Sequence, residues 1–560
     1  MLNKKTAEQA KDAVHKRYER LLKNLAELGE GDLAERYLGS IAHLYDPHTS
    51  YFSAESFQEF NVSVSLKLYG IGAILGVEDD QCVVKEVVLG GPADLARQLK
   101  ANDKIISVAQ GTGEPVEVLG MNLRKIVGMI RGAKGTQVRL VIQPAGATDS
   151  SSRKEIVITR DLVKINSSRA RAAVFDVPDA AGVNQPIGVI TLPGFYASDE
   201  GDTDADQDRP IASRDVERLI TQLKAQNIQA LVLDLRRNGG GVLNEAIEIA
   251  GLFVNKGPIV QVKAYDGDIQ VASDNKEKIA YAGPLAVLVD RFSASASEIV
   301  AGALQNYGRA VIIGDSATHG KGSVQQIYNM RQSPNLARAA GKTGGAKFTI
   351  QKFYLPSGES TQLKGVVPDI VLPSVDDFIP GIGEASLSHS LVWDKIRSSY
   401  FDGAPLDPKV LTPLRQASLE RQGKLEEFSW LRRNIDWFKA RVDQKLVSVN
   451  LADRRAQKTS DDAFRKQMKA EREVIAKSDF SFKEFRLTPA TPKPKPEKKT
   501  EEKAEGDEDD EDPADDESDT YAKADVHLRE SLRVLGDAIR LGRNKEHWAS
   551  NRAPLTANGG

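Results

Sequence analysis

The sequence predicts an α/β core, a β-rich module inserted ahead of it, and helical regions at both ends. Two observations carry this prediction. Residues 166–385 alternate apolar strand-like runs with amphipathic helical patterns, which is typical of a layered sheet with crossover helices. Residues 61–165 instead hold short β-like runs around two short helical patterns. The 560 residues suffice for several domains.

The core elements follow from hydrophobic periodicity. We expect strands at Ile187–Leu192, Ala230–Leu235, Leu285–Val289 and Ala310–Ile313, and helices at Ser213–Gln226, Leu243–Phe253 and Glu298–Leu304. Each strand is short and apolar, as expected for a sheet covered on both faces.

The flanking regions differ in composition. Residues 1–60 carry leucines at helical spacing and end in a Pro-containing turn, and residues 386–487 read as charged helices with tryptophan and leucine anchors. Residues 488–521 hold a Pro/Lys run and then an acidic run, which predicts a disordered linker. Residues 522–560 begin with an amphipathic helix and end in a tail.

Composition excludes several classes of function. The net charge of −3 and the lack of a basic stripe with interleaved aromatic residues argue against a nucleic-acid partner. The single cysteine, Cys82, excludes an internal disulfide and a cysteine-based zinc site, and the scattered histidines form no His-x-x-x-His pair. No stretch is long and apolar enough for a transmembrane segment, and we expect no signal peptide in this chain.

The most informative segment combines a serine turn with a later lysine. The strand ending at Asp290 breaks into Ser293-Ala-Ser295-Ala-Ser297 ahead of a helix, and Gly320-Lys321-Gly322 follows the next strand. Small residues at such a turn let a hydroxyl project from the sheet edge. A buried lysine can serve as the base that activates it, because burial can lower a lysine pKa by as much as ~3–5 units from ~10.4.

A glycine run lies between another strand and helix. In Asp234-Leu-Arg-Arg-Asn-Gly-Gly-Gly241, backbone donors at a helix start would face an anion. The Gly-Lys-[Ser/Thr] of a phosphate-binding P-loop is missing, so an oxyanion beside Ser295 fits better. A plain tight turn is the alternative.

The β-rich module resembles a PDZ domain. Its first strand carries Tyr69-Gly70-Ile71-Gly72-Ala73-Ile74, followed by Gly90-Gly-Pro-Ala-Asp94. In PDZ domains such a loop offers N–H groups to the terminal carboxylate of a peptide, which adds as a strand to the sheet edge.

From Asp46-Pro-His-Thr49 to Pro373, the chain resembles the tail-specific proteases of the C-terminal-processing peptidase family, closest to the large Gram-negative branch. The motifs are the PDZ-like loop, the glycine run, the serine turn, Gly320-Lys-Gly-Ser-Val-Gln325 and Ser360-Thr-Gln-Leu-Lys-Gly-Val-Val-Pro-Asp369. The resemblance implies a crotonase/ClpP-like α/β protease core at 166–385 and a PDZ domain at 61–165.

The resemblance also implies the site residues. The nucleophile falls on Ser295, the general base on Lys321, and the residue that orients the lysine on Gln325, one turn further if that segment is helical. Ser293 and Ser297 are then structural. The oxyanion donors would be the N–H of Ala296 and of a glycine in 239–241, with Gly240 favoured.

The remaining implications concern substrate and setting. Gly70, Ile71, Gly72 and Ala73 would hold the C-terminus of proteins with flexible, apolar tails, and tail binding would reorient the PDZ domain and assemble the site. The resemblance suggests a periplasmic or cell-envelope location and a lipoprotein adaptor as a partner. We expect no metal, ATP or other cofactor.

This chain departs from the family pattern in three places. The loop before Lys321 is one residue longer than usual, and Asn306 stands where an acidic residue is common, so we assign Asn306 no catalytic role. The N-terminal helical region is shorter than in large members.

Three alternatives compete with the Ser–Lys reading. His319 suggests a Ser–His pair, but the sequence shows no acidic residue that would act as the partner of the histidine. Glu298 fits an acidic residue in the first turn of a helix, where it interacts with the helix dipole, better than it fits a catalytic residue. A catalytically decayed PDZ scaffold would bind tails without cutting them. A crotonase-like acyl-transfer enzyme would bind coenzyme A.

Overall fold

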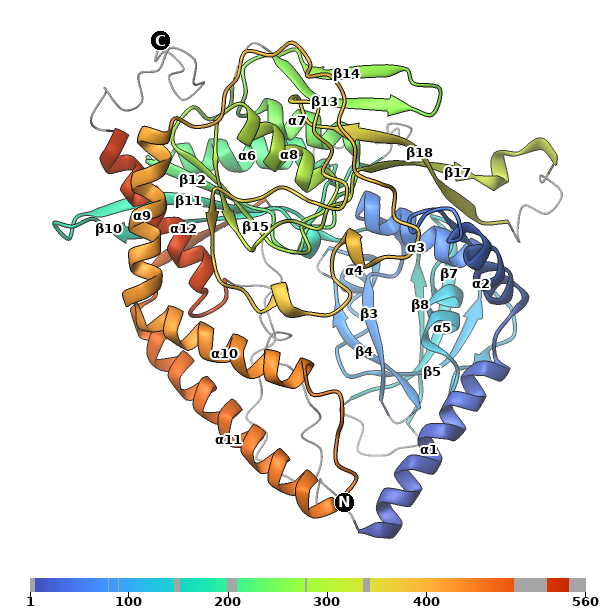
Figure 1. Cartoon of the computed structure of the whole chain (residues 1–560). Helices are drawn as coiled ribbons and strands as arrows, with labels where there is room; N and C mark the ends of the chain where they lie inside the picture. The colour runs from blue at the N-terminus through green and yellow to red at the C-terminus, as the bar shows by residue number, and fades with distance from the viewer. Residues whose placement is uncertain are drawn as a thin grey trace.

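A computed structural model gives the fold of residues 6–78, 80–88, 90–145, 152–198, 209–276, 279–335, 343–487 and 521–542 (Figure 1). The predicted linker, except Tyr521, and the predicted tail after 542 lie outside these residues. No helix in these ranges combines the length and the apolar composition that a membrane span needs.

The core is built on a mixed sheet with the order β19-β16-β15-β12-β11-β10-β20. Strands β11, β12, β15, β16 and β19 are parallel, whereas β10 pairs antiparallel with β11 and β20. The bounds are β10 (Arg171–Pro178), β11 (Asn184–Thr191), β12 (Ala230–Asp234), β15 (Leu285–Val289), β16 (Val311–Gly314), β19 (Ile370–Val371) and β20 (Phe482–Arg486). Every residue of β12, β15 and β16 is buried, as the apolar runs predict.

Helices cover both faces of this sheet. One face packs against α6 (Ala212–Lys224), α7 (Leu243–Gly251) and α8 (Ala296–Asn306). The other packs against α9 (Pro408–Lys424), α10 (Glu426–Val442) and α12 (Val526–Gly542). Figure 1 shows α12, the red helix, beside α9 and the core strands, so the last described helix completes the core.

From its buried end at Phe428, α10 runs outward from the core, and α11 (Leu451–Ile475) lies beside it (Figure 1). Trp437 on α10 stacks on Phe464 of α11 with ring centroids 5.2 Å apart. The predicted tryptophan anchor therefore fastens this pair.

A second core sheet has the order β1-β18-β13-β14, with β17 also pairing with β18. Its strands are β1 (Ser50–Phe52), β13 (Gly257–Ala264), β14 (Ile269–Asp274), β17 (Ser323–Asn329) and β18 (Gly345–Tyr354). Strand β1 is part of the predicted Pro-containing turn region, and its pairing with β18 attaches the N-terminal region to the core.

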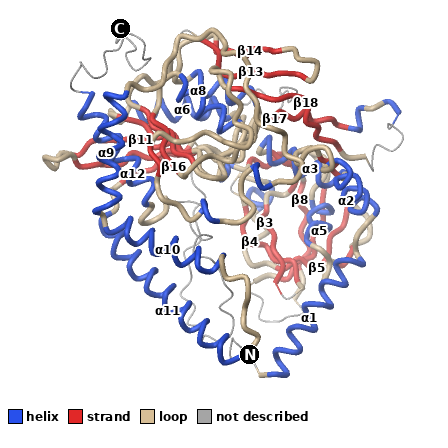
Figure 2. Tube along the Cα trace, in the orientation of Figure 1, coloured by secondary structure: helices blue, strands red, loops and turns tan. Residues whose placement is uncertain are grey.

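The β-rich module lies between the N-terminal helices and the core. Figure 2 shows its strands as a second group, apart from those of the core. A sheet with the order β3-β4-β5-β7-β8 packs against α4 and α5, and β2 pairs with β9. The bounds are β2 (Lys67–Gly70), β3 (Ala73–Glu78), β4 (Gln81–Val87), α4 (Pro92–Ala96), β5 (Lys104–Gln110), β6 (Val116–Glu117), α5 (Leu123–Ile130), β7 (Gln137–Gln143), β8 (Lys154–Thr159) and β9 (Asp161–Lys164).

The N-terminal region is helical, as predicted. It contains α1 (Ala7–Ala26), α2 (Glu30–Ala42) and α3 (Ala54–Ser65). Lys23 on α1 donates a 2.6 Å hydrogen bond to the carbonyl of Gly120, so α1 contacts the β-rich module.

Candidate active site

Ser295 stands at a strained turn between β15 and α8. Its backbone has φ 57° and ψ −111°, a region that a residue with a side chain rarely adopts. The turn leaves Ser295 partly exposed. A strand-to-helix turn of this kind can present a side-chain hydroxyl to a bound molecule.

The flanking serines are buried and hydrogen-bonded. Ser293 Oγ donates to the carbonyl of Leu235, and Ser297 Oγ donates to the carbonyl of Asn238, each at 2.8 Å. Both therefore fasten the turn at Ser295 to the loop that follows β12, in agreement with the structural role expected for them.

Glu298 lies at the centre of the site. Its carboxylate accepts hydrogen bonds from the backbone N–H of Ser295 at 2.7 Å, Gly320 at 2.7 Å and Lys321 at 3.0 Å. It also accepts one from Thr318 Oγ1 at 2.6 Å. Burial raises the pKa of Glu298 to about 7, and these hydrogen bonds oppose the rise.

The sequence-based view of Glu298 as a helix-dipole residue was thus too narrow. The Glu298 side chain joins the turn at Ser295 (the serine elbow) to the loop between β16 and β17 that carries Lys321 (the lysine loop). More than twenty residues separate Ser295 from Lys321 in the sequence. The first-turn position was visible in the sequence, but its hydrogen-bond partners were not.

Lys321 lies in the loop between β16 and β17. Burial lowers the pKa of its amine to about 8, and the nearby charge of Lys347 acts in the same direction. The carboxylates of Glu384, Glu298 and Asp46 act in the opposite direction. A lysine of this kind is partly neutral near neutral pH, as a general base must be.

The side chains of Ser295 and Lys321 are not joined by a hydrogen bond among the residues that the structure describes. Their backbone nitrogens, however, bind the same oxygen, Glu298 Oε2. Catalytic hydrogen bonds are often long before substrate binds and tighten in the complex.

Gln325 lies on strand β17, so the helical spacing from Lys321 that the sequence left open does not apply. The pairing of β17 with β18 shifts register between Val324 and Gln325 and places Gln325 opposite Thr349. Gln325 Nε2 donates to Ser323 Oγ at 2.8 Å and to Thr349 Oγ1 at 3.1 Å.

The glycine run contacts the serine elbow. A Cβ placed on Gly240, whose φ is +105°, would lie 2.9 Å from Ser295 Cβ and 3.2 Å from the nitrogen of Ala296. The N–H of Gly240, however, donates to Asn238 Oδ1 at 2.9 Å, so this conformation does not offer it to an oxyanion. Within the described residues, the N–H of Ala296 has no hydrogen-bond partner.

The predicted tail-binding loop connects β2 to β3. Gly70, Ile71 and Gly72 are buried and Ala73 is half-buried. The carbonyls of Ile71 and Gly72 accept hydrogen bonds from Ala93 and Val88. Among the described residues their N–H groups have no partner, as a carboxylate-binding loop requires.

A buried carboxylate–imidazole pair lies near Lys321. His48 Nε2 is 2.8 Å from Glu384 Oε2, and His319 Nδ1 is 3.8 Å from the same oxygen. His319 therefore has an acid nearby that the sequence did not reveal. Glu384 also accepts a 2.9 Å hydrogen bond from Gln362, whose own Oε1 accepts from the N–H of Gly322.

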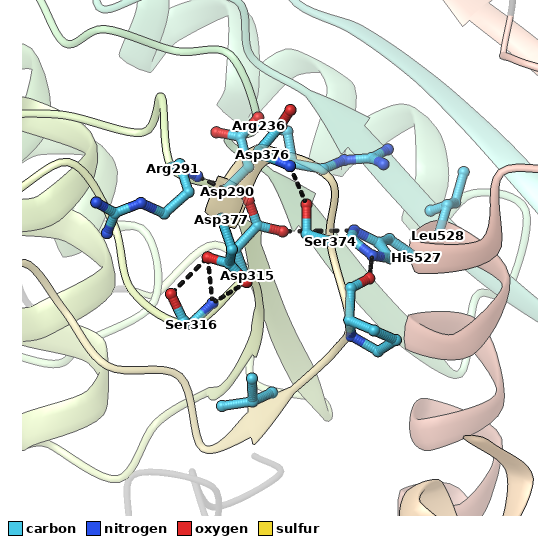
Figure 3. Close-up of polar contacts among 12 residues, drawn as sticks. Arg236, Asp290, Arg291, Asp315, Ser316, Ser374, Asp376, Asp377, His527 and Leu528 are labelled. Carbon is cyan, nitrogen blue, oxygen red and sulfur yellow. Dashed lines mark hydrogen bonds and ion pairs between the residues drawn. The ribbon is translucent and has the colours of Figure 1, made fainter. Parts of the chain in front are cut away.

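A cavity of about 480 Å³ lies at the carboxyl ends of the parallel strands, and its lining includes Asp234, Asp290 and Asp315. Figure 3 shows Asp290 and Asp315 of this lining together with His527. Arg236 pairs there with Asp234 at 2.8 Å and with Asp525 at 2.7 Å. His527 Nδ1 is 3.8 Å from Asp315 Oδ1, and its Nε2 bonds the carbonyl of Pro373 at 2.8 Å. The contact between His527 and Asp315 thus holds the start of α12 against the first residue of the loop that carries Lys321.

Asn306 has a structural partner. Its Oδ1 accepts a 3.0 Å hydrogen bond from the N–H of Ser357.

Four family models match successive parts of the chain. They are the tail specific protease N-terminal domain at residues 1–55, the PDZ domain at 61–143, peptidase family S41 at 186–372, and the C-terminal domain of tail specific protease at 381–540.

Curated relatives agree with these matches. A tail-specific protease of Haemophilus influenzae is 38% identical over 473 residues, which cover 83% of this chain and 64% of that protein. The chain therefore spans slightly less than two thirds of that relative. A carboxy-terminal-processing protease of Bartonella bacilliformis is 31% identical, covering 61% of this chain and 69% of that protein. Another, from Bacillus subtilis, is 30% identical and covers 67% and 70%. The chain belongs to the S41 peptidase family of C-terminal-processing proteases.

Proposed function

We propose that this chain is a serine endopeptidase of the Ser–Lys type, which recognises apolar C-terminal tails through its PDZ domain and degrades or processes the proteins that carry them. One observation carries the chemistry: Ser295, in its strained elbow, and Lys321 share the Glu298 carboxylate through their backbone amides. Membership of the S41 family supports the same reaction.

The proposed reaction proceeds in two steps. The neutral amine of Lys321 accepts the proton of Ser295 Oγ while Oγ bonds to the substrate carbonyl carbon, and the N–H of Ala296 donates to the oxyanion. The C–N bond then breaks, and the Lys321 ammonium returns the proton to the leaving amine. Water, deprotonated by Lys321, hydrolyses the acyl-enzyme and restores Ser295.

Tail recognition is assigned to the loop 70–73 and to the edge of strand β3. Within the described part of the chain, β3 pairs only with β4, so its other edge can accept an added strand. The unpartnered N–H groups of Ile71 and Gly72 suit a terminal carboxylate. We infer that the tail binds there, with apolar side chains toward α5.

Tail binding would also complete the catalytic centre. Two features support this part of the proposal: no hydrogen bond joins the side chains of Ser295 and Lys321 in the described residues, and the N–H of Gly240 is held by Asn238. A modest shift of the loops would align the dyad and release this donor.

The setting is proposed from relatives. Tail-specific and carboxy-terminal-processing proteases are the curated proteins that this chain resembles. We propose a periplasmic or cell-envelope location, and a lipoprotein adaptor as a partner that delivers substrates.

The test is cleavage of an unfolded reporter ending in Leu-Ala-Ala, compared with the same reporter ending in Asp-Asp. The full chain should cut the first and spare the second, while Ser295→Ala and Lys321→Ala should bind the first without cutting it. Cutting that survives either substitution would refute the dyad. Binding without cutting by the unsubstituted chain would favour the tail-binding scaffold.

A further inference from the structure

The segment Asp46–Thr49 enters the core from the N-terminal region. Directly after it, β1 pairs antiparallel with β18, with Ser50 opposite Lys347 and Phe52 opposite Gly345. Strand β18 also pairs with β17, which begins two residues after Lys321. A segment distant in sequence therefore lies beside the strands that support the proposed base.

Asp46 is 6% exposed, and among the described residues it accepts hydrogen bonds from its own segment and from β18. Asp46 Oδ1 accepts from the N–H of His48 at 2.9 Å and of Thr49 at 3.1 Å, and Oδ2 accepts from Thr49 Oγ1. Burial alone would raise the pKa of Asp46, but the hydrogen bonds from Thr49, Thr349 and His48 outweigh burial and hold it below its usual value. Asp46 is therefore a fixed negative charge.

Thr349 connects this charge to Gln325. Thr349 Oγ1 donates to Asp46 Oδ1 at 2.7 Å. Since a hydroxyl has one hydrogen, Thr349 Oγ1 can only accept in its 3.1 Å contact with Gln325 Nε2. The second hydrogen of that amide goes to Ser323 Oγ at 2.8 Å.

The direction of this relay fixes the amide of Gln325. Both of its N–H groups are used, so Gln325 Oε1 is the atom left to accept a proton donor. A carboxylate at the start of the relay strengthens each following hydrogen bond.

Asp46 also acts on Lys321 by charge. The charged groups around Lys321 come from several elements: Lys347 on β18, Glu298 on α8, Glu384 in a short 3-10 turn, His319 on its own loop, and Asp46. Asp46 favours the protonated lysine, whereas Lys347 disfavours it. The two actions of Asp46, through Thr349 and through charge, are separable by substitution.

We propose that Asp46 is a positioning residue for the Ser–Lys reaction: through Thr349 it orients the amide of Gln325, which we propose in turn orients the amine of Lys321, so that the N-terminal segment completes a site otherwise built from the core. This inference rests on the proposed endopeptidase function.

The experiment compares Thr349→Val, Thr349→Ser, Asp46→Asn and the control Asp12→Asn in the full chain. Asp12 lies on α1, where its exposed side chain pairs with Lys16. The readouts are kcat and KM on the Leu-Ala-Ala reporter across pH, the thermal midpoint, and the pH dependence of Lys321 acetylation by acetic anhydride, followed by mass spectrometry.

Thr349→Val should lower kcat about tenfold or more, with KM and the pH dependence of Lys321 unchanged, and Thr349→Ser should restore it. Asp46→Asn should lower kcat and also move the Lys321 titration to lower pH, because the lysine loses a favourable anion. Asp12→Asn should match the unsubstituted chain.

Two results would overturn the positioning role alone while the unsubstituted chain cuts normally: full kcat in Thr349→Val, or no recovery in Thr349→Ser. An unshifted Lys321 titration in a folded Asp46→Asn variant would overturn the charge component. Cutting that survives Ser295→Ala, or no cutting by the unsubstituted chain, would overturn the proposed function and this inference with it.

Discussion

The backbone amides of Ser295 and Lys321 donate to the same oxygen, Glu298 Oε2, at 2.7 and 3.0 Å. The separation of the two nitrogens therefore cannot exceed the sum of those distances. The serine elbow and the lysine loop follow different strands, and a single buried carboxylate holds the two segments close together. Displacement of either loop would break a charge-assisted hydrogen bond.

Glu298→Gln should lower kcat/KM about 100-fold, because a small misplacement of reacting groups has effects of that size. The amide would turn an NH₂ toward backbone donors that now meet carboxylate oxygens. The measurement is tail-reporter cleavage together with tail binding, which should be unchanged. Glu55→Gln, at an exposed first-turn glutamate of α3, is the matched control. Equal activity of the two variants would show that Glu298 interacts only with the helix dipole and does not position Ser295 and Lys321.

The pH dependence of cleavage follows from Lys321, whose pKa burial lowers to about 8. The base must be neutral, so kcat/KM should rise about tenfold per pH unit below that value and level off above it. The check is a pH–rate profile of the full chain. A profile that is flat from about pH 6 to 9 would contradict the lysine as base.

Lys347→Met should move this profile to higher pH. The charge of Lys347 helps to lower the pKa of Lys321, so its removal makes the neutral base rarer at a given pH. Lys352→Met, on the same strand β18, provides the control, because Lys352 pairs with Asp394 instead. Equal shifts in the two variants would show an effect of net charge rather than of proximity.

The layered core and the strand-to-helix turn at Ser295 could be predicted because each depends on a local sequence pattern. Buried parallel strands such as Leu285–Val289 are continuous apolar runs, and Ser295 follows a strand within a run of small residues. Strand positions 50–52 and 482–486 were missed because both strands are short and depend on partners far away in sequence.

The contacts that organise the site could not be predicted for the same reason. The local sequence around Glu298 indicates only an acidic residue in the first turn of a helix. No nearby sequence pattern indicates that its carboxylate binds the backbone of Lys321. The four-residue spacing between Lys321 and Gln325 left a helix possible, whereas pairing with β18 makes this segment a strand. Tertiary pairing decided the structure of this short polar segment.

Gly72→Ala should raise KM for tailed substrates at least about tenfold, with little change in kcat. Gly72 has φ +73°, and a Cβ there would lie 3.1 Å from Gly91 Cα, so the loop that should hold the tail carboxylate must shift. Gly135→Ala is the control, because Gly135 has φ +79° with open space around it. The comparison uses reporter kinetics and binding of a fluorescent Leu-Ala-Ala peptide. Equal effects would show that backbone strain in the PDZ domain, not the loop, governs binding.

Leu532→Ala should destabilise the protease core by about 2–5 kcal/mol, the usual range for truncating a buried leucine. Leu532 on α12 is fully buried in the cluster that covers one face of the core sheet, together with residues of α9 and α10. The measurement is denaturant unfolding followed by tryptophan fluorescence, because Trp430 of α10 packs against this cluster. Leu419→Ala on α9, where the side chain is 57% exposed, should change stability by less than about 1 kcal/mol. If the two variants unfold alike, the apolar packing of α12 against the core contributes little to the stability of the folded chain.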